Sequence, residues 1–240
     1  MPSITILGPG RMGTALAAAL RRAGAEVRGP LGRGEIPSGG DDLVLLCVPD
    51  REIAAAAATI PPGLLVGHVS ASAPLDLLAP HERFSMHPLL SVVGAGAQFD
   101  GAYCAIDGSS PAALEAARTL AELLGMRVRV VPRDQRALYH AAASMASNFL
   151  ITLEGAAERL GNAVGLEREA LVPLVRATVD NWARQGARAA LTGPIARGDV
   201  ATAARQREAV ADAAPDLLPL WDALAAATRE LAVAPATDAA

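Results

Sequence analysis

The sequence contains no lysine, and this absence removes several classes of function. All 21 basic residues of the 240-residue chain are arginine. A P-loop nucleotide site, a Schiff-base mechanism and a lysine proton donor each need an ammonium group, so all three are excluded. The net charge is −4, with 25 acidic residues against those 21 arginines. Because nucleic-acid binding needs a basic surface, this balance argues against a nucleic-acid partner.

Cysteines and long apolar runs are also scarce. The two cysteines, Cys47 and Cys104, cannot build a disulfide framework and are too few for a zinc cluster, so we expect no metal site. Both lie in apolar runs and are interpreted as small buried residues. No apolar run approaches the roughly 20 residues that span a bilayer, and no basic leader precedes the first glycines. We therefore expect a soluble, cytoplasmic protein with no membrane partner.

Aliphatic residues dominate instead, because hydrophobic residues make up 52% of the chain and aromatic residues only 3%. Up to Pro132, short β-forming runs such as SITIL and DLVLLCV alternate with Ala/Leu-rich helical stretches. This alternation predicts an α/β fold with a doubly wound parallel sheet of the Rossmann type. From Asp134 onward only helical patterns follow. We predict a dinucleotide-binding domain at residues 1–132 and an all-α domain at residues 133–240.

The expected elements can be placed by their composition and by the turn residues around them. Asp50 and Asp199 are expected to cap the helices that follow them. The expected strands cover residues 3–7, 25–28, 42–48, 63–69, 83–86, 102–106 and 127–131. The expected helices cover residues 14–23, 51–60, 111–124, 134–164, 167–190, 199–214 and 215–232.

The segment GPGRMG at residues 8–13 fits the pattern G-x-G-x-x-G, between an expected strand and an expected helix. In that setting Gly8 permits a tight turn, Gly10 lets backbone N–H groups approach a pyrophosphate, and Gly13 lets the helix pack on the strand. The amino end of the helix adds the positive end of its dipole. We therefore interpret the loop, which also includes Pro9, Arg11 and Met12, as a dinucleotide cradle and not as a glycine turn without a ligand.

Charges after the second expected strand indicate which dinucleotide binds. NAD sites usually offer Asp or Glu there to the ribose 2′-hydroxyl. Here Arg28 and Arg33 follow, and together with Arg11 they are placed to hold a 2′-phosphate. NADP is therefore favoured over NAD. Glu26 and Glu35 lie close enough in sequence that NAD stays open.

Three segments end expected strands and carry residues suited to a site. Ligands of open parallel sheets bind beyond the carboxyl ends of the strands. We expect Val48, Pro49 and Asp50 to contact the cofactor, and Ser70 to hydrogen-bond the nicotinamide amide or a substrate. His87 is expected to face the same crevice. The alternatives are a Ser70 that caps the next turn and a His87 that packs within a loop.

On the long helix expected after residue 134, His140, Ser144 and Asn148 recur every four residues and so share one face. We predict a substrate-facing stripe, with internal helix–helix hydrogen bonds as the alternative. A carbonyl or imine that receives hydride needs a proton donor, and His140 is the candidate because histidine ionises near neutrality. Ser144 and Asn148 would orient the substrate. Tyr139 is expected to pack, although a tyrosine donor stays open.

The loop LTGPIARGD at residues 191–199 forms a second polar cluster. Thr192 and Arg197 are candidates for substrate binding, because a guanidinium group holds a carboxylate through two hydrogen bonds. The alternative for Arg197 is a surface or subunit-interface position.

Five segments together resemble a bacterial family: GPGRMG, VPD, SMHPL, LYHAAASMASNFLITL and LTGPIARGD. This family pairs a Rossmann-like domain with a C-terminal domain of unknown function 2520, and the resemblance covers nearly the whole chain. It places the chain among the 6-phosphogluconate-dehydrogenase-like reductases. Ketopantoate reductases of that group carry a Lys-x-x-x-Asn-x-x-x-Asn stripe with the lysine as proton donor. His140 stands at the lysine, and Ser144 and Asn148 stand at the asparagines.

The resemblance implies an NADP-dependent oxidoreductase that acts on a small carboxylate substrate. The single reaction that the resemblance favours most is the reduction of 2-dehydropantoate (ketopantoate) to pantoate, a step of pantothenate biosynthesis. A homodimer through the largely apolar helical domain is also expected. Two alternatives stay open: an imine reductase of the pyrroline-5-carboxylate reductase type, and an NADP-binding sensor that has lost catalysis along with the lysine.

Overall fold

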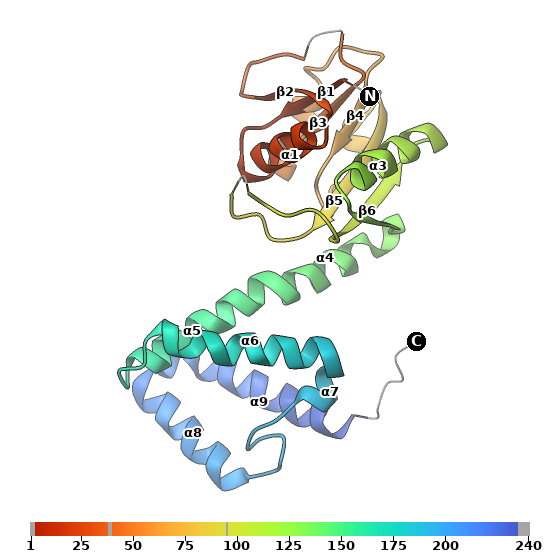
Figure 1. The fold of residues 1–240 in the computed structure, drawn as a ribbon. Helices are drawn as coiled ribbons and strands as arrows, with labels where there is room; N and C mark the ends of the chain where they lie inside the picture. The colour runs from red at the N-terminus through yellow and green to blue at the C-terminus, as the bar shows by residue number, and fades with distance from the viewer. Residues whose placement is uncertain (1–2, 38–39, 95, 235–240) are drawn as a thin grey trace. The chain divides into compact units, whose positions relative to one another are not determined.

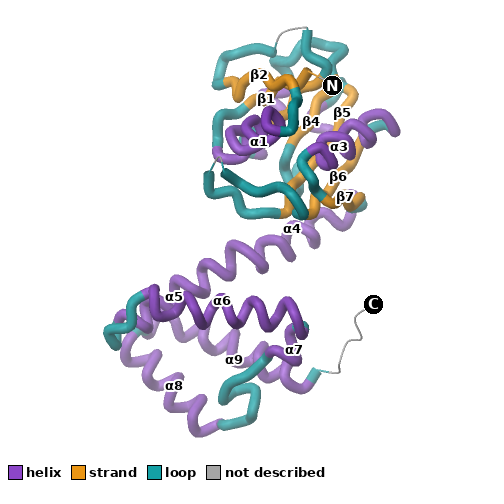
Figure 2. The backbone as a smooth tube through the Cα atoms, in the orientation of Figure 1, coloured by secondary structure: helices purple, strands orange, loops and turns teal. Residues whose placement is uncertain are grey.

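The structure is a computed structural model that describes residues 3–37, 40–94 and 96–234. The chain forms two compact units, Met1–Ser147 and Asn148–Ala240. All the strands that the structure describes lie in the first unit, which we call the sheet unit (Figure 2). The described part of the second unit is helical, and we call it the helical unit.

The sheet unit contains a seven-stranded sheet in the order β2-β1-β3-β4-β5-β6-β7. The first five strands in this order are parallel, which confirms the predicted α/β architecture, but β6 runs antiparallel to β5. No helix is described between these two strands, and a parallel return would need such a crossover. The strands are β1 (Ser3–Leu7), β2 (Glu26–Leu31), β3 (Leu43–Leu46), β4 (Leu65–His68), β5 (Glu82–Leu89), β6 (Tyr103–Gly108) and β7 (Arg127–Val130).

Helices cover both faces of the sheet. On one face α1 (Arg11–Arg22) and α3 (Pro111–Leu123) pack an aliphatic core against the strands, as Figure 1 shows. On the other face α2 (Ile53–Ala57) and the short 3₁₀ helix η2 (Leu75–Leu78) pack a second, smaller core. This two-sided cover explains why all four residues of β3 are buried, as the apolar run predicted.

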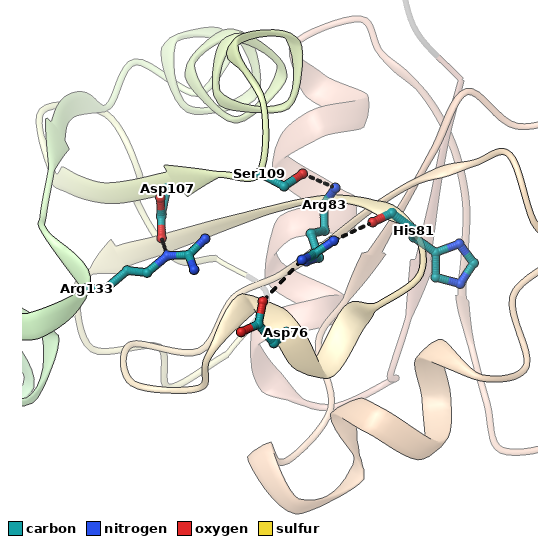
Figure 3. Close-up of polar contacts among 6 residues, drawn as sticks. All are labelled: Asp76, His81, Arg83, Asp107, Ser109 and Arg133. Atoms are coloured by element: carbon teal, nitrogen blue, oxygen red, sulfur yellow. Dashed lines mark hydrogen bonds and ion pairs between the residues drawn. The ribbon is translucent and has the colours of Figure 1, made fainter.

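Arg83 joins η2 to the start of β5 through three contacts (Figure 3). Its guanidinium donates to the Asp76 carboxylate at 3.1 Å and to the carbonyl of His81 at 3.2 Å. Its backbone N–H donates to the hydroxyl oxygen of Ser109 at 3.0 Å. These bonds hold the connection between β4 and β5 against the sheet.

The helix expected over residues 51–60 differs from the prediction at its start. Residues Asp50–Glu52 form a 3₁₀ turn (η1) without a side-chain cap, and α2 begins only at Ile53. The Asp50 carboxylate instead accepts a hydrogen bond from the hydroxyl of Ser70 at 2.8 Å. The expectation that Asp50 caps this helix is therefore wrong, because its side chain is engaged by the end of the neighbouring strand.

The long helix expected over residues 134–164 is found, in several parts. After a 3₁₀ turn (η3, Arg133–Gln135) come α4 (Arg136–Ser144), a π-helical segment (η4, Met145–Phe149) and α5 (Leu150–Asn162). The last strand ends at Val130, close to the predicted boundary at residue 132. The compact units nevertheless divide inside the π-helical segment.

The helical unit continues with α6 (Arg168–Gln185), α7 (Ala187–Ala190), α8 (Val200–Ala213), a 3₁₀ turn (η5, Pro215–Leu217) and α9 (Leu218–Val233). Gly186, with a φ of 77°, interrupts the single helix expected over residues 167–190. Asp199 caps α8 as predicted, because its carboxylate accepts from the N–H of Thr202 at 3.0 Å. No helix in the described part of the chain is both long and apolar enough to cross a membrane.

Candidate functional site

The strand register brings the predicted segments to one edge of the sheet. Leu7, Leu46, His68 and Ser85 are successive partners across β1, β3, β4 and β5. Because these strands are parallel, the residues that come after these four partners in the chain all lie at the carboxyl edge of the sheet. The glycine turn, the segment after β3, the segment after β4 and His87 are therefore neighbours, as the sequence predicted.

In the glycine turn, Gly8 and Gly13 stand where a side chain would collide with the backbone. Gly8 has a φ of +111°, and a Cβ there would collide with the backbone carbonyl of Cys47. A Cβ on Gly13 would collide with the carbonyl of Gly8, so α1 packs close to the turn only because residue 13 lacks a side chain. Gly10 is different, because no atom of a described residue beyond its chain neighbours lies within 4 Å of the position its Cβ would take.

The amino end of α1 leaves hydrogen-bond donors available beside this open position. Gly10 is the N-cap and provides no side-chain cap, and the first turn has no acidic residue. The N–H groups of a first helical turn lack partners within the helix. Arg11 and Met12, which begin α1, therefore present backbone N–H groups that suit an anion such as a phosphate.

A cavity of about 730 Å³ lies next to the turn, within the sheet unit. It is lined by residues 7–10, 31–36 and 47–49, together with residues of the α2 region. The predicted residues Gly8, Pro9, Gly10, Val48 and Pro49 belong to its wall. Its volume suits a sizeable organic ligand.

Charges of both signs lie on this cavity. Arg33 is 88% exposed, and its Nη2 lies 3.3 Å from the Glu52 carboxylate. The Glu35 carboxylate accepts from the N–H of Gly32. Arg28 does not line the cavity, because β2 extends to Leu31 and so places Arg28 within the strand, 3.9 Å from the Asp41 carboxylate.

Ser70 links the ends of two strands. Its hydroxyl donates to the Asp50 carboxylate at 2.8 Å and accepts from the N–H groups of Ser72 and Ala73 at 3.2 and 2.9 Å. A hydroxyl has one donor and two acceptor sites, and all three are used here. Ser70 thus follows the alternative interpretation, in which it caps the next turn.

His87 on β5 and Tyr139 on α4 form a polar contact. Nδ1 of His87 shares a hydrogen bond of 2.8 Å with the Tyr139 hydroxyl, and the two rings meet edge to face. The ring of His140 lies 6.3 Å from that of His87. Burial, followed by the charge of His140, lowers the pKa of His87 to about 4. Burial raises the pKa of Tyr139 to about 12. Tyr139 therefore does more than pack.

Arg136 and His68 are two buried polar residues that the sequence patterns did not single out. Arg136 is only 6% exposed, and its Nη1 donates to the carbonyl of Ala71 at 3.5 Å. His68 is fully buried, and its Nδ1 accepts from the N–H of Ser70 at 3.2 Å. Burial and then the Arg136 charge lower the pKa of His68 to about 4. The missed signal was spacing, because Arg136 stands four residues before His140 and extends the predicted stripe.

The stripe itself is only partly regular. His140 is exposed and Ser144 half-buried, both on α4. The π-helical segment then interrupts the 3.6-residue period before Asn148, which is exposed. Neither Ser144 nor Asn148 forms a side-chain hydrogen bond with a described residue, so the internal helix–helix bonds of the alternative interpretation are not found. The substrate-facing role stays a prediction.

Thr192 and Arg197 lie in the helical unit, in the turns between α7 and α8. Both are exposed, and Gly193 and Gly198 shape the loop with φ values of 102° and 73°. Their contact with a substrate also stays a prediction. Both cysteines are free, and burial raises the pKa of each thiol to about 12, so neither Cys47 nor Cys104 is a reactive thiolate.

Comparison with known families gives one match. The family model described as Domain of unknown function (DUF2520) matches residues 102–228, which is more than half of the chain. No curated protein matches the sequence.

Solved structures show the same fold at low sequence identity. A Bacteroides fragilis protein provisionally described as an NADP oxidoreductase is 20% identical, with a TM-score of 0.82 over 95% of this chain and 98% of that one. A Thermotoga maritima protein is 24% identical, with a TM-score of 0.75 and the same coverage. The reductive aminase of Aspergillus terreus, in complex with NADPH and ethyl-5-oxohexanoate, is 19% identical, with a TM-score of 0.70 over 96% and 94%. These likenesses confirm the predicted fold class.

Proposed function

Because the chain belongs to the family described as Domain of unknown function (DUF2520) and has the fold of NADPH-binding reductases, we propose that it is an NADP-dependent oxidoreductase that reduces a C=O or C=N bond of a small molecule. One observation carries this proposal. The glycine turn and its cavity lie at the same sheet edge as the polar cluster of His87 and Tyr139. When bound, the dinucleotide supplies the hydride that reduces the substrate carbon.

The residues of the turn fit a dinucleotide. Gly8 and Gly13 hold the backbone in a shape that a Cβ would block, and the space beside Gly10 is open to a pyrophosphate. The uncapped amino end of α1 offers N–H donors to its negative charge. Arg33 on the cavity and Arg11 at the helix start favour NADP over NAD, because each can pair with the 2′-phosphate.

The proton donor is His140. The new C–H bond leaves negative charge on the substrate oxygen or nitrogen, so one proton must reach that atom. His87 is neutral at pH 7 because its pKa is about 4, and Tyr139, with a pKa of about 12, is a weak acid. His140 is exposed, so solvent can return its proton after each turnover. Ser144 and Asn148 orient the substrate atom that receives the proton.

The substrate is a small keto acid, and ketopantoate is the candidate that the family resemblance names. An imine is the second candidate, favoured by the shared fold with a reductive aminase. Both reductions consume one hydride and one proton, and they differ only in the atom that is protonated. Thr192 and Arg197 are proposed to contact the substrate from the helical unit.

The working form is proposed to be a homodimer joined through the helical unit. Large apolar side chains on its helices are exposed, including Ile151, Leu174 and Trp182. A cavity of about 610 Å³ lies between α8 and α9, and one of about 190 Å³ lies among α5, α8 and α9. Apolar exposure on this scale marks an association surface, and a second copy of the chain would cover it.

The test is an NADPH-oxidation screen of the purified chain across 2-keto acids, including ketopantoate, and cyclic imino acids. We expect turnover with at least one class. His140→Ala should lower kcat by about 10² to 10⁴-fold, the usual contribution of a proton donor. Tyr139→Phe should change kcat less. Asn148→Ala should raise KM, and Asn162→Ala on the same long helix provides the matched control.

Two outcomes would overturn this proposal. NADPH binding without oxidation across the whole panel would indicate a sensor without catalysis. Unchanged activity of His140→Ala, combined with a large loss in Tyr139→Phe, would transfer the proton-donor role to the tyrosine.

A further inference from the structure

Arg136 is a buried cation with an unused hydrogen-bonding edge. Its side chain begins α4 and is 6% exposed. Nη1 makes one long bond to the carbonyl of Ala71, whereas Nε and Nη2 are buried and have no partner among the described residues. These two atoms lie on the same edge of the guanidinium plane, and their N–H bonds are parallel. The edge therefore has the geometry of a carboxylate clamp.

The same edge holds carboxylates elsewhere in this chain. Arg168 donates through Nε and Nη2 to the two oxygens of Glu158, at 2.5 and 3.0 Å. Arg207 holds Asp222 in the same way, at 2.7 and 2.8 Å. Both of these pairs are exposed. At Arg136 the corresponding two donors face the interior without a carboxylate from the described chain.

Asp107, an acidic residue whose charge acts on Arg136, is already engaged. Asp107 on β6 accepts from Nε of Arg133 at 3.2 Å, and its other oxygen accepts from the backbone N–H of Gly108 (Figure 3). Its charge favours the charged form of Arg136, but it forms no hydrogen bond to that residue. A buried guanidinium with two unpaired N–H groups costs folding free energy. Such a cost is typical of a residue kept for binding.

We propose that Arg136 binds the carboxylate of the substrate through Nε and Nη2, and that the substrates are therefore 2-keto or 2-imino acids. This inference rests on the proposed reductase function and adds the residue that binds the substrate's carboxylate, which requires that carboxylate to lie next to the reducible bond. His140 stands four residues after Arg136 on the same helix, so the two side chains are about 6 Å apart at their base. In a 2-keto or 2-imino acid the reducible carbon is bonded directly to the carboxylate carbon. A carboxylate on Arg136 would thus hold the reacting C=O or C=N beside the proposed donor.

The surroundings of Arg136 suit this role. His68 and His87 have pKa values lowered to about 4, so both are neutral at pH 7 and do not repel the charge of Arg136. Ser85 and His68 are register partners, and Oγ of Ser85 and Nε2 of His68 are also buried without a hydrogen-bond partner among the described residues. These atoms add hydrogen-bonding capacity to the same part of the sheet unit.

The experiment compares carboxylate binding with turnover. Isobutyrate, which cannot be reduced, is titrated into the NADP⁺-loaded protein and followed by thermal shift and calorimetry, with isobutyramide as the neutral match. We expect isobutyrate to bind and isobutyramide to bind far more weakly. Arg136→Met should weaken isobutyrate binding by at least about 30-fold. Arg136→Lys, which keeps the charge and loses the planar fork, should weaken it about tenfold. Arg129→Met, an exposed arginine of β7, is the control and should bind as the wild type does.

A second measurement, the melting temperature, distinguishes a binding role of Arg136 from a structural role. Without a ligand, Arg136→Met should melt at the same temperature as the wild type or higher, because it removes an unpaired buried charge. If Arg136 is structural, this variant melts lower and Arg136→Lys binds isobutyrate as the wild type does, which overturns the inference. Wild-type protein that reduces neutral imines but binds no carboxylate also overturns it, while the reductase proposal stands. Carboxylate binding that depends on Arg136 in a protein without NADPH oxidation supports it, while the reductase proposal fails.

Discussion

The two compact units bury their apolar side chains very differently. In the described part of the sheet unit 35 hydrophobic residues are buried, whereas in the described part of the helical unit only Val210, Ala214 and Ala225 are. Large apolar side chains such as Leu174 and Trp182 are 65% and 57% exposed. Since burial of apolar surface is the main driving force of folding, the sheet unit gains far more stabilisation from its core than the described part of the helical unit does.

Among the described residues, arginine–carboxylate pairs that use two guanidinium nitrogens show the opposite distribution. Bidentate pairs between arginine and carboxylate tie helices together in the helical unit: Arg159 with Asp216, Arg168 with Glu158, and Arg207 with Asp222. All three pairs are solvent-exposed, and such surface pairs contribute little to stability. They set the positions of the helices but do not replace a core. The comparison supports the proposal that a second chain completes the helical unit.

The largest expected effect is on assembly. Leu174→Glu combined with Trp182→Glu places two charges on one face of α6, since the positions are eight residues apart. We expect a dimer-to-monomer shift, with the dissociation constant raised at least about 1000-fold because burying each charge costs several kcal/mol. Light scattering after size exclusion measures the mass.

The control for assembly is Val93→Glu, at an 81% exposed position of the sheet unit, which should leave the mass unchanged. A wild-type chain that is monomeric at micromolar concentration and melts in one transition would contradict the comparison, because the helical unit would then be stable by itself.

The next largest effect concerns the packing of the glycine turn in the sheet unit. Gly13→Ala places a Cβ against the carbonyl of Gly8 and should cost about 1–3 kcal/mol of unfolding free energy, as overpacking does. Gly10→Ala meets no protein atom and should leave stability nearly unchanged, while weakening NADPH binding by crowding the pyrophosphate. Urea unfolding and fluorescence titration with NADPH measure the two quantities. Equal losses of stability in both variants would refute the distinct roles of these glycines.

The smallest effect concerns pH. His68 is buried and neutral, with a pKa of about 4 in the folded chain against about 6.5 when unfolded. The unfolded chain therefore binds more protons between these values, and stability falls as pH drops through this window. From pH 7 to pH 5 we expect His68 to account for a loss of about 2 kcal/mol. His68→Asn should reduce this loss, as measured by urea unfolding at both pH values. An unchanged pH dependence in the variant would show that folding does not lower the pKa of His68.

Much of the fold was predictable because its signals are local. The run at Ser3–Leu7 is β1, the glycine pattern begins α1, and Asp199 caps α8. Each follows from neighbours in sequence: β-forming residues, backbone freedom, or a side chain that accepts from an N–H three residues later. The antiparallel direction of β6 relative to β5 was not predictable, because the direction of a strand depends on the path of the connection that leads to it.

The site was predictable only in part. The turn at Gly8–Gly13 and the approach of His87 to the sheet edge follow from strand order. Two contacts with partners distant in sequence were not predicted. Asp50 is engaged by Ser70, twenty residues away, and Tyr139 bonds His87, which lies on β5. Spacing along a helix shows which residues share a face but not which element lies opposite.

The sequence by itself determined the order of strands and helices, the glycine turn and the lack of any lysine for chemistry. These depend on residue type and spacing, which act over a few residues. Only the tertiary structure decided that Arg136 is buried with one edge of its guanidinium unpaired among the described residues. It also decided that the Ser70 hydroxyl forms its hydrogen bonds within the chain. Burial and hydrogen-bond pairing are set by elements that meet from distant parts of the chain, so no local pattern reveals them.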